Sequence, residues 1–251
     1  MAEPAPVLTH VTRKTRTAPA RALRYGTAIF LGAFLLFQVQ PLLAQALLPR
    51  FGGSSSVWAT CMVVFQVLLL VGYAYAHFIS RWTPRRQALA HAVLLLVSLA
   101  FLPITSLQES RETGDPALRI ARLLLRNIGL PYMMLAATGP LLQSWFASET
   151  KAAPYRFYAL SNAASLLGLL TFPFLVQPLL DLTGQDRLWS GGYALFVLSL
   201  LVVTVAYARS GTERLVPERA AENRARTDSR MDHVLWILLP AAASVLLLGL
   251  T

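Results

Sequence analysis

Long apolar stretches joined by short polar connections dominate the sequence. No charged side chain occurs from about residue 25 to 48 or from 57 to 79. Each stretch exceeds the roughly 20 residues that a helix needs to cross a bilayer. The connection between them, Pro-Arg-Phe-Gly-Gly-Ser, is rich in residues that favour turns. The pattern therefore predicts two membrane helices that fold back on each other as a hairpin.

The same pattern repeats along the rest of the chain. Further spans are predicted at about 88–107, 127–146, 157–180 and 188–208, and a seventh begins near Val234 and reaches Thr251. The predicted fold is an all-α polytopic membrane protein with six complete transmembrane helices plus the start of a seventh. The predicted domains are a disordered basic cytoplasmic leader at 1–24, a six-helix membrane domain at 25–208, a cytoplasmic linker at 209–233 and the start of the seventh helix at 234–251.

Composition and charge agree with this class of protein. Hydrophobic residues make up 55% of the chain and charged residues only 14%, which favours a polytopic membrane protein over a soluble domain. The net charge of +10 would suggest a nucleic-acid partner in a soluble protein, but here the basic residues lie in the connections. With a cytoplasmic N-terminus, 16 of the 22 Lys and Arg residues fall in cytoplasmic segments, as the positive-inside rule requires. The expected partner is the lipid bilayer, with no nucleic acid.

A cleaved signal peptide is an alternative for the N-terminal region. A basic leader precedes an apolar stretch that ends in an Ala-x-Ala-like site at 44–46. That stretch is longer than a signal peptide requires, and Gln38, Gln40 and Pro41 interrupt it, so a retained helix is favoured.

Cys61 lies inside the second span, so the sequence predicts neither a disulfide nor a thiolate metal site.

The connection between the third and fourth spans contains a second kind of pattern. Asp115 can cap a short helix whose first turn accepts Pro116, and Arg119, Arg122 and Arg126 would then share one face. Apolar residues alternate with these arginines, which predicts a helix that lies in the interface on the outer side of the membrane. The arginines would either extend to lipid head groups, the favoured interpretation, or attract an anionic solute.

Polar residues inside the apolar stretches are the candidates for function. Gln38 and Gln45 lie seven residues apart on one helical face, and Gln66, Tyr73 and His77 repeat at spacings of seven and four in the returning helix, so the two polar stripes could meet. Polar groups facing lipid are costly, so these side chains should either bond a neighbouring helix or line a cavity. The substrate-binding candidates are Gln38, Gln45, Gln66, Tyr73, His77, Gln143, Asn162 and Ser165.

The fifth span combines small residues with one strongly polar side chain. Ala159 with Ala163, and Ala164 with Gly168, form small-xxx-small pairs that allow another helix to approach closely. We expect Asn162, beside them, to be buried and to be the best single candidate for a cavity residue.

Motifs of catalysis and cofactor binding are absent from the sequence. It contains no G-x-G-x-x-G, no P-loop, no H-E-x-x-H and no alternation of strands and helices, and no acidic residue lies within a complete predicted span. The sequence therefore predicts no catalytic, cofactor-binding or metal-binding residue in this chain, and leaves enzyme activity undecided.

Four stretches together resemble the membrane region of bacterial fused major-facilitator/spermidine-synthase-like proteins. They read FQVQPLLAQALLPRFGGSSSVWATCMVVFQVLLLVGYAYAH, GLPYMMLAATGPLLQSWFAS, YALSNAASLLGLLTFPFLVQP and LWILLPAAASVLLLGLT. The resemblance runs from about Phe30 to Thr251. It departs from the family pattern at Gln177, where an acidic residue is expected before Pro178, and at Ala164, where a glycine is expected.

The resemblance implies a major-facilitator-like half in the bacterial inner membrane, followed in the family by an aminopropyltransferase-like domain. It implies a transporter-like function in which polyamines or related small solutes are handled, and no independent feature of the spans argues for polyamines. One alternative is a membrane scaffold or anchor for a catalytic domain that this sequence lacks. A second alternative is a protein that binds or senses a membrane lipid or a partner protein. The implied partners are a C-terminal synthase-like domain or a second membrane half.

Overall fold

The computed structural model describes residues 17–105, 114–150 and 155–209. The chain divides into two units, residues 1–211 and 212–251, and every described residue belongs to the first. The predictions for residues 1–16 and 210–251, which cover most of the leader, the linker and the seventh helix, lie outside the described residues. Within the described ranges the protein is all-helical and contains no strand.

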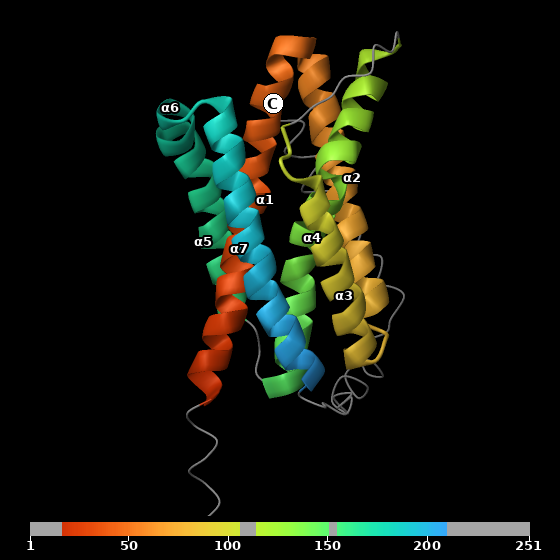
Figure 1. Ribbon diagram of the computed structural model, residues 1–251, viewed down its shortest axis with the longest axis vertical. Coiled ribbons are helices and arrows are strands. Elements are labelled where there is room, and N and C mark those ends of the chain that lie inside the picture. Colours follow the sequence, from red (N-terminus) through yellow and green to blue (C-terminus); the bar gives the residue numbers. More distant parts are fainter. Residues whose placement is uncertain (1–16, 106–113, 151–154, 210–251) are drawn as a thin grey trace, which may run out of the picture. The chain divides into compact units, whose positions relative to one another are not determined.

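Six helices of 15 residues or more make up the described part (Figure 1). They are α1 (Thr17–Phe51), α2 (Ser55–Ile79), α3 (Pro84–Ser98), α4 (Pro116–Thr150), α5 (Tyr155–Thr171) and α7 (Leu182–Arg209). A 3₁₀ turn, η1 (Leu99–Phe101), extends α3, and a π-helical segment, η2 (Phe172–Val176), joins α5 to the short α6 (Gln177–Leu179).

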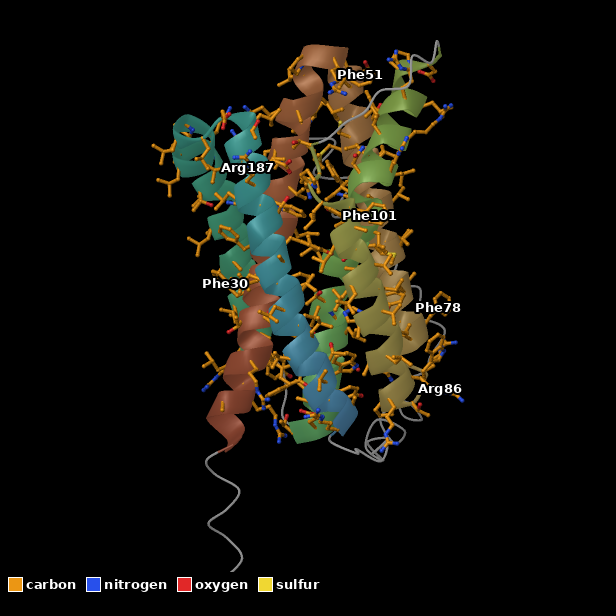
Figure 2. All side chains as sticks on the ribbon, in the orientation of Figure 1. Phe30, Phe51, Phe78, Arg86, Phe101 and Arg187 are labelled. Atoms are coloured by element: carbon orange, nitrogen blue, oxygen red, sulfur yellow. The ribbon has the colours of Figure 1, made fainter. Side chains whose placement is uncertain are left out.

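Each long helix runs antiparallel to the one before it (Figure 1). One end of the unit therefore gathers the start of α1, the α2–α3 turn and the end of α7, and the other gathers the α1–α2 turn and the start of α4. Figure 2 shows Arg86 at the first end and Phe51 at the second. This up-and-down arrangement agrees with the alternation expected of successive membrane spans.

Four helical segments in the described part of the chain are long and apolar enough to cross a membrane. They are Ala20–Phe51, Ser55–Ile79, Tyr155–Leu179 and Leu182–Arg209. Helix α3 has 15 residues, about 22 Å at 1.5 Å per residue, which is shorter than a hydrocarbon core of about 30 Å. Helix α4 is longer, but its first third contains three arginines. The crossing of the membrane by α3 and α4 therefore stays a prediction.

The turn between α1 and α2 has the expected residues in the expected conformations. Gly52 adopts a φ of +75°, which glycine reaches without steric cost, and its N–H bonds the Leu48 carbonyl at 2.9 Å. Ser54 then caps α2, since its Oγ accepts a hydrogen bond from the Val57 N–H at 3.4 Å. The hairpin turn is thus built by glycine and serine, as the sequence indicates.

The two helices of this hairpin pack mainly on other helices, so their polar stripes do not meet. Helix α2 packs chiefly on α4, and α1 packs chiefly on α5. A Cβ at Gly72 would lie 2.7 Å from the Ala136 Cβ, and one at Gly168 would lie 2.6 Å from the Phe34 carbonyl oxygen. Because these two positions are glycine, the backbone of α2 can approach α4 closely and the backbone of α5 can approach α1 closely. These close approaches favour the two observed helix pairs.

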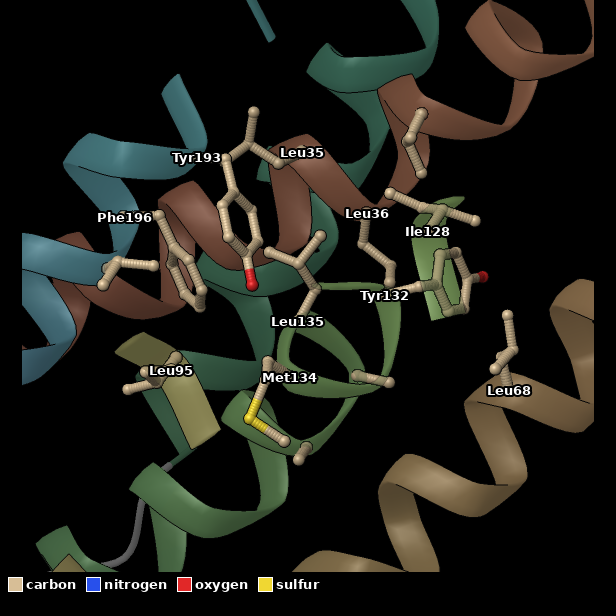
Figure 3. Close-up of a cluster of buried hydrophobic side chains, with 14 of the residues drawn as sticks. Leu35, Leu36, Leu68, Leu95, Ile128, Tyr132, Met134, Leu135, Tyr193 and Phe196 are labelled. Atoms are coloured by element: carbon tan, nitrogen blue, oxygen red, sulfur yellow. The ribbon is translucent and has the colours of Figure 1, made fainter. Parts of the chain in front are cut away.

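Buried aromatic and aliphatic side chains from the six long helices form the core, part of which Figure 3 shows. Leu35, Leu68, Leu95, Tyr132 and Phe196 come from α1, α2, α3, α4 and α7, and Phe157 comes from α5; all are buried. The indole N–H of Trp189 in α7 also donates to the Leu35 carbonyl of α1 at 3.1 Å. The core therefore joins α7 to α1 by packing and by a hydrogen bond.

Three local expectations need correction. Residues 17–24, expected in a disordered leader, form the first turns of α1. Asp115 does cap a helix, accepting from the Ala117 N–H at 3.0 Å, but this helix continues without a break into the fourth predicted span. Of the two small-residue pairs, Ala164 and Gly168 are buried, whereas Ala159 and Ala163 are exposed. A continuous apolar face on α4 explains the second difference, and a single contact face on α5 explains the third.

Candidate functional site

A cavity of about 300 Å³ lies between α1, α2, α4 and α5. This volume is at the lower end of the range for small-molecule sites and equals the liquid volume of about ten water molecules. The lining residues are Ile29, Ala33, Leu36, Phe37, Tyr73, Leu135, Ala136, Thr138, Gly139, Pro140, Ser161, Asn162 and Ser165.

Hydroxyl groups on α4 and α5 offer acceptors to this cavity. Thr138 donates its hydroxyl hydrogen to the Met134 carbonyl at 2.7 Å, and Ser165 donates to the Ser161 carbonyl at 2.9 Å. Both hydroxyl hydrogens are therefore used within their own helices. The two oxygens keep lone pairs that can accept a hydrogen bond from a solute.

Pro140 adds a backbone acceptor to the same wall. Proline has no N–H, so the carbonyl four residues earlier, that of Ala136, lacks its usual helical donor. Ala136 and Pro140 both line the cavity. Broken helical hydrogen bonding beside a cavity is a recurrent feature of solute sites in membrane proteins.

Tyr73 on α2 and Asn162 on α5 supply the donors. Tyr73 is 49% exposed and Asn162 is exposed, in contrast to the burial expected for this asparagine. Neither side chain has a hydrogen-bond partner among the described residues. The phenol O–H and the amide NH₂ are therefore available at the opening of the cavity, and the amide oxygen adds an acceptor.

The remaining wall is apolar and comes mainly from α1. Ile29, Ala33, Leu36 and Phe37 form it, at the three- and four-residue spacing of a single helical face. No charged side chain is among the described residues that line the cavity. The cavity therefore has one apolar side and one neutral hydrogen-bonding side.

Three of the eight candidates from the sequence, Tyr73, Asn162 and Ser165, come together at this cavity. Gln38 instead bonds the Thr171 hydroxyl of α5 at 3.1 Å. Gln66 and His77 lie on the exposed surface of α2, where the His77 Nε2 is 3.0 Å from an Arg81 guanidinium nitrogen. Gln45 and Gln143 are partly buried away from the lining. Substrate contact by any of the eight stays a prediction.

Thr138, Ser161 and Pro140 also line the cavity, and the sequence pattern did not place them there. The signal for Pro140 was visible, because a proline inside an apolar stretch frees a carbonyl. The sequence does not mark Thr138 and Ser161 as cavity residues, because a Ser or Thr hydroxyl in a helix can donate its hydrogen bond to a carbonyl of the preceding turn.

Two buried polar side chains outside the cavity join separate parts of the chain. The Gln87 Oε1 accepts from the Trp145 indole N–H at 2.8 Å, and its amide NH₂ donates to the Ser80 and Trp82 carbonyls. Asp186 accepts from the Ile104 N–H at 3.1 Å and from the Thr105 hydroxyl at 2.8 Å. Asp186 precedes the predicted start of its span by two residues, so its inclusion in α7 was not expected.

No group of three or more His, Cys, Asp or Glu side chains that could hold a metal ion occurs in the described ranges. Cys61 is a buried free thiol.

Comparisons with known protein families, curated proteins and solved structures find no match to this chain. The structure itself defines the class at a coarse level. The described part is all-helical, and four of its helical segments are long and apolar enough to cross a membrane. These are the features of a multi-pass helical membrane protein with a small neutral cavity among its helices.

Proposed function

We propose that the six-helix unit is the solute-binding half of a transporter-like domain in a bacterial inner membrane, with its N-terminus in the cytoplasm. The observation that carries this proposal is the cavity in which polar groups from α2, α4 and α5 converge opposite an apolar wall. Convergent hydrogen-bonding groups in an otherwise apolar pocket are the usual design of a small-molecule site. Pairing with a second membrane half would complete such a domain.

The lining favours an uncharged solute with several hydrogen-bond donors. Ser165, Thr138 and the Ala136 carbonyl supply acceptors, and Tyr73 and Asn162 supply donors. A cation taken from water into this site would meet no carboxylate, so its desolvation would be only partly offset. A polyol or an amide fits this inventory better than a polyamine, the solute class that the resemblance implies.

The first test is binding by calorimetry to the full chain, purified in detergent. Sorbitol, putrescine and succinate provide a neutral, a dicationic and a dianionic probe. We expect millimolar or tighter binding of sorbitol, and at least a tenfold loss of affinity in Asn162→Leu, since one hydrogen-bonding group is worth about 1.4 kcal/mol in this range.

Gln66→Ala is the matched control, because Gln66 is exposed and outside the cavity lining. Its affinity for sorbitol should equal that of the unmodified chain. If putrescine or succinate binds and the binding depends on Asn162, the proposal of a solute site holds. The proposal that the solute is uncharged is then rejected. Failure of all three probes to bind would reject the solute site and favour the scaffold for an aminopropyltransferase-like domain.

A further inference from the structure

A second hollow lies along an exposed face of α7. It is a groove of about 380 Å³ lined by Arg24 of α1 and by Leu198, Leu201, Val202, Val205, Ala206 and Arg209 of α7. We define these residues as the α7 groove. None of them lines the neutral cavity.

The apolar floor of the groove follows one helical face. Leu198, Leu201, Val202, Val205 and Ala206 recur at spacings of three and four. Leu198 is 61% exposed and Val202 48% exposed, so this face has no described helix upon it. In a bilayer such a surface is covered by acyl chains.

The two arginines lie where the apolar face ends. Arg209 is the last residue of α7 and Arg24 lies near the start of α1, and these helix termini occupy the same end of the unit (Figure 1). Both side chains are exposed. The carboxylate of Glu149 instead pairs with Arg21, with Nε and Oε2 at 3.8 Å. Neither Arg24 nor Arg209 forms an ion pair among the described residues.

From this arrangement we propose that the α7 groove binds one anionic phospholipid. An acyl chain lies along the apolar floor, and the phosphate is held by the guanidinium groups of Arg24 and Arg209. Guanidinium binds phosphate through paired hydrogen bonds, and basic pockets beside membrane helices on the cytoplasmic side select anionic head groups. The predicted orientation places these arginines on that side.

Native mass spectrometry of the full, delipidated chain tests the proposal. Dioleoylphosphatidylglycerol is the probe, and dioleoylphosphatidylcholine has the same chains without net charge. We expect R24Q/R209Q to weaken phosphatidylglycerol binding by about 10- to 30-fold, from about 1 kcal/mol per basic residue near a head group. Phosphatidylcholine binding should fall by much less, because its choline cation offsets the charge of the phosphate.

R85Q/R86Q is the matched control, because it removes two exposed arginines from α3 at the same end but outside the groove. It should leave phosphatidylglycerol affinity within twofold. An equal loss in this control would show that only general surface charge is involved, and would overturn the proposal.

Val202→Trp tests the groove itself, since the indole fills the apolar floor without changing charge. We expect at least a fivefold loss of phosphatidylglycerol affinity with the arginines intact. If soluble glycerol 1-phosphate binds as tightly as the lipid, or if Val202→Trp leaves lipid affinity unchanged, then the arginines bind a free anion and no lipid site exists.

Discussion

Gly72 and Gly168 bring helix backbones closer together than any larger residue would permit. The Cβ of an alanine at Gly168 would lie 2.6 Å from the Phe34 carbonyl oxygen, and one at Gly72 would lie 2.9 Å from the Met133 carbonyl oxygen. Both oxygens belong to the backbone and cannot rotate away. The sequence predicts a close contact at Gly168 from its pairing with Ala164. It does not predict that the partner is α1, because spacing along one helix contains no information about the second.

We expect Gly168→Ala and Gly72→Ala each to lower the free energy of unfolding in detergent by about 1–3 kcal/mol, the usual cost of overpacking. The measurement is thermal or denaturant unfolding followed by circular dichroism. Gly191→Ala is the control, since no neighbouring atom lies within 4 Å of the position that a Cβ would take there. That variant should be neutral or slightly stabilising, because alanine is the better helix former. An equal loss of unfolding free energy in Gly191→Ala would show that close packing at Gly72 and Gly168 is not the cause of the destabilisation.

Gln38 illustrates what the polar pattern can and cannot predict. Its burial follows from its place in an apolar stretch, and the expectation of an interhelical bond agrees with its contact to Thr171. The choice of α5 over α2 depends on the backbone approach at Gly168, which only the folded structure shows.

A double-mutant cycle of Gln38→Leu and Thr171→Val should give a coupling free energy of about 0.6 kcal/mol, the average for such bonds in membrane proteins. Unfolding of the two single variants and the double variant in detergent provides the value. A coupling near zero would mean that the bond contributes nothing beyond packing.

At the scale of elements, apolar length predicted the helices well and their ends poorly. The turns at Gly52 and Ser54 follow from residues with strong turn preferences. By contrast, α4 begins at Pro116 and not near residue 127, because Ile120 and Leu124 are buried against the unit despite the arginines among them. A mixed basic and apolar sequence is compatible with either an interfacial helix or an extended core helix.

Asp186 joins α7 to the segment that follows α3. We expect Asp186→Ala to speed hydrogen exchange at the Ile104 amide by about 10- to 100-fold, since hydrogen bonds to charged groups contribute about 1.5–3 kcal/mol. Mass spectrometry or NMR of exchange would measure this. Asp181→Ala is the control, because the Asp181 carboxylate accepts from the Gly184 N–H at the start of α7 and is not bonded to Ile104. An unchanged exchange rate of the Ile104 amide in Asp186→Ala would show that the hydrogen bond to Asp186 does not protect this amide.

At the scale of the whole molecule, hydrophobicity predicted an all-helical chain but not the assembly of its cavity. Tyr73, Asn162 and Ser165 come from helices whose neighbours the sequence did not identify. The cavity arises because α1 pairs with α5, α2 pairs with α4, and the two pairs meet along side chains that are partly small or polar. The periodic pattern of one helix does not show which of the other helices pack against it, so it could not predict a cavity built by four helices.

The arrangement also predicts the sidedness of the unit. In a Cys61→Ala background, single cysteines at Ser54 and Gly114 should react with an impermeant maleimide in intact cells. Cysteines at Arg86 and Tyr155 should react only after permeabilisation, because helices α2 to α4 each reverse direction. Reaction of positions 86 and 114 on the same side would show that α3 does not cross the membrane.

The pairing of α1 with α5 and of α2 with α4 has a mechanical consequence. Each pair is held at backbone distance by a glycine and resists separation, whereas the pairs face each other across the cavity through side chains. Movement between the pairs is opposed by side-chain contacts between α1 and α4, among them the hydrogen bond from the Gln40 amide to the Tyr132 hydroxyl at 2.9 Å. A parting of the pairs that widens the cavity must therefore break such side-chain contacts, while the backbone contacts at the two glycines stay intact.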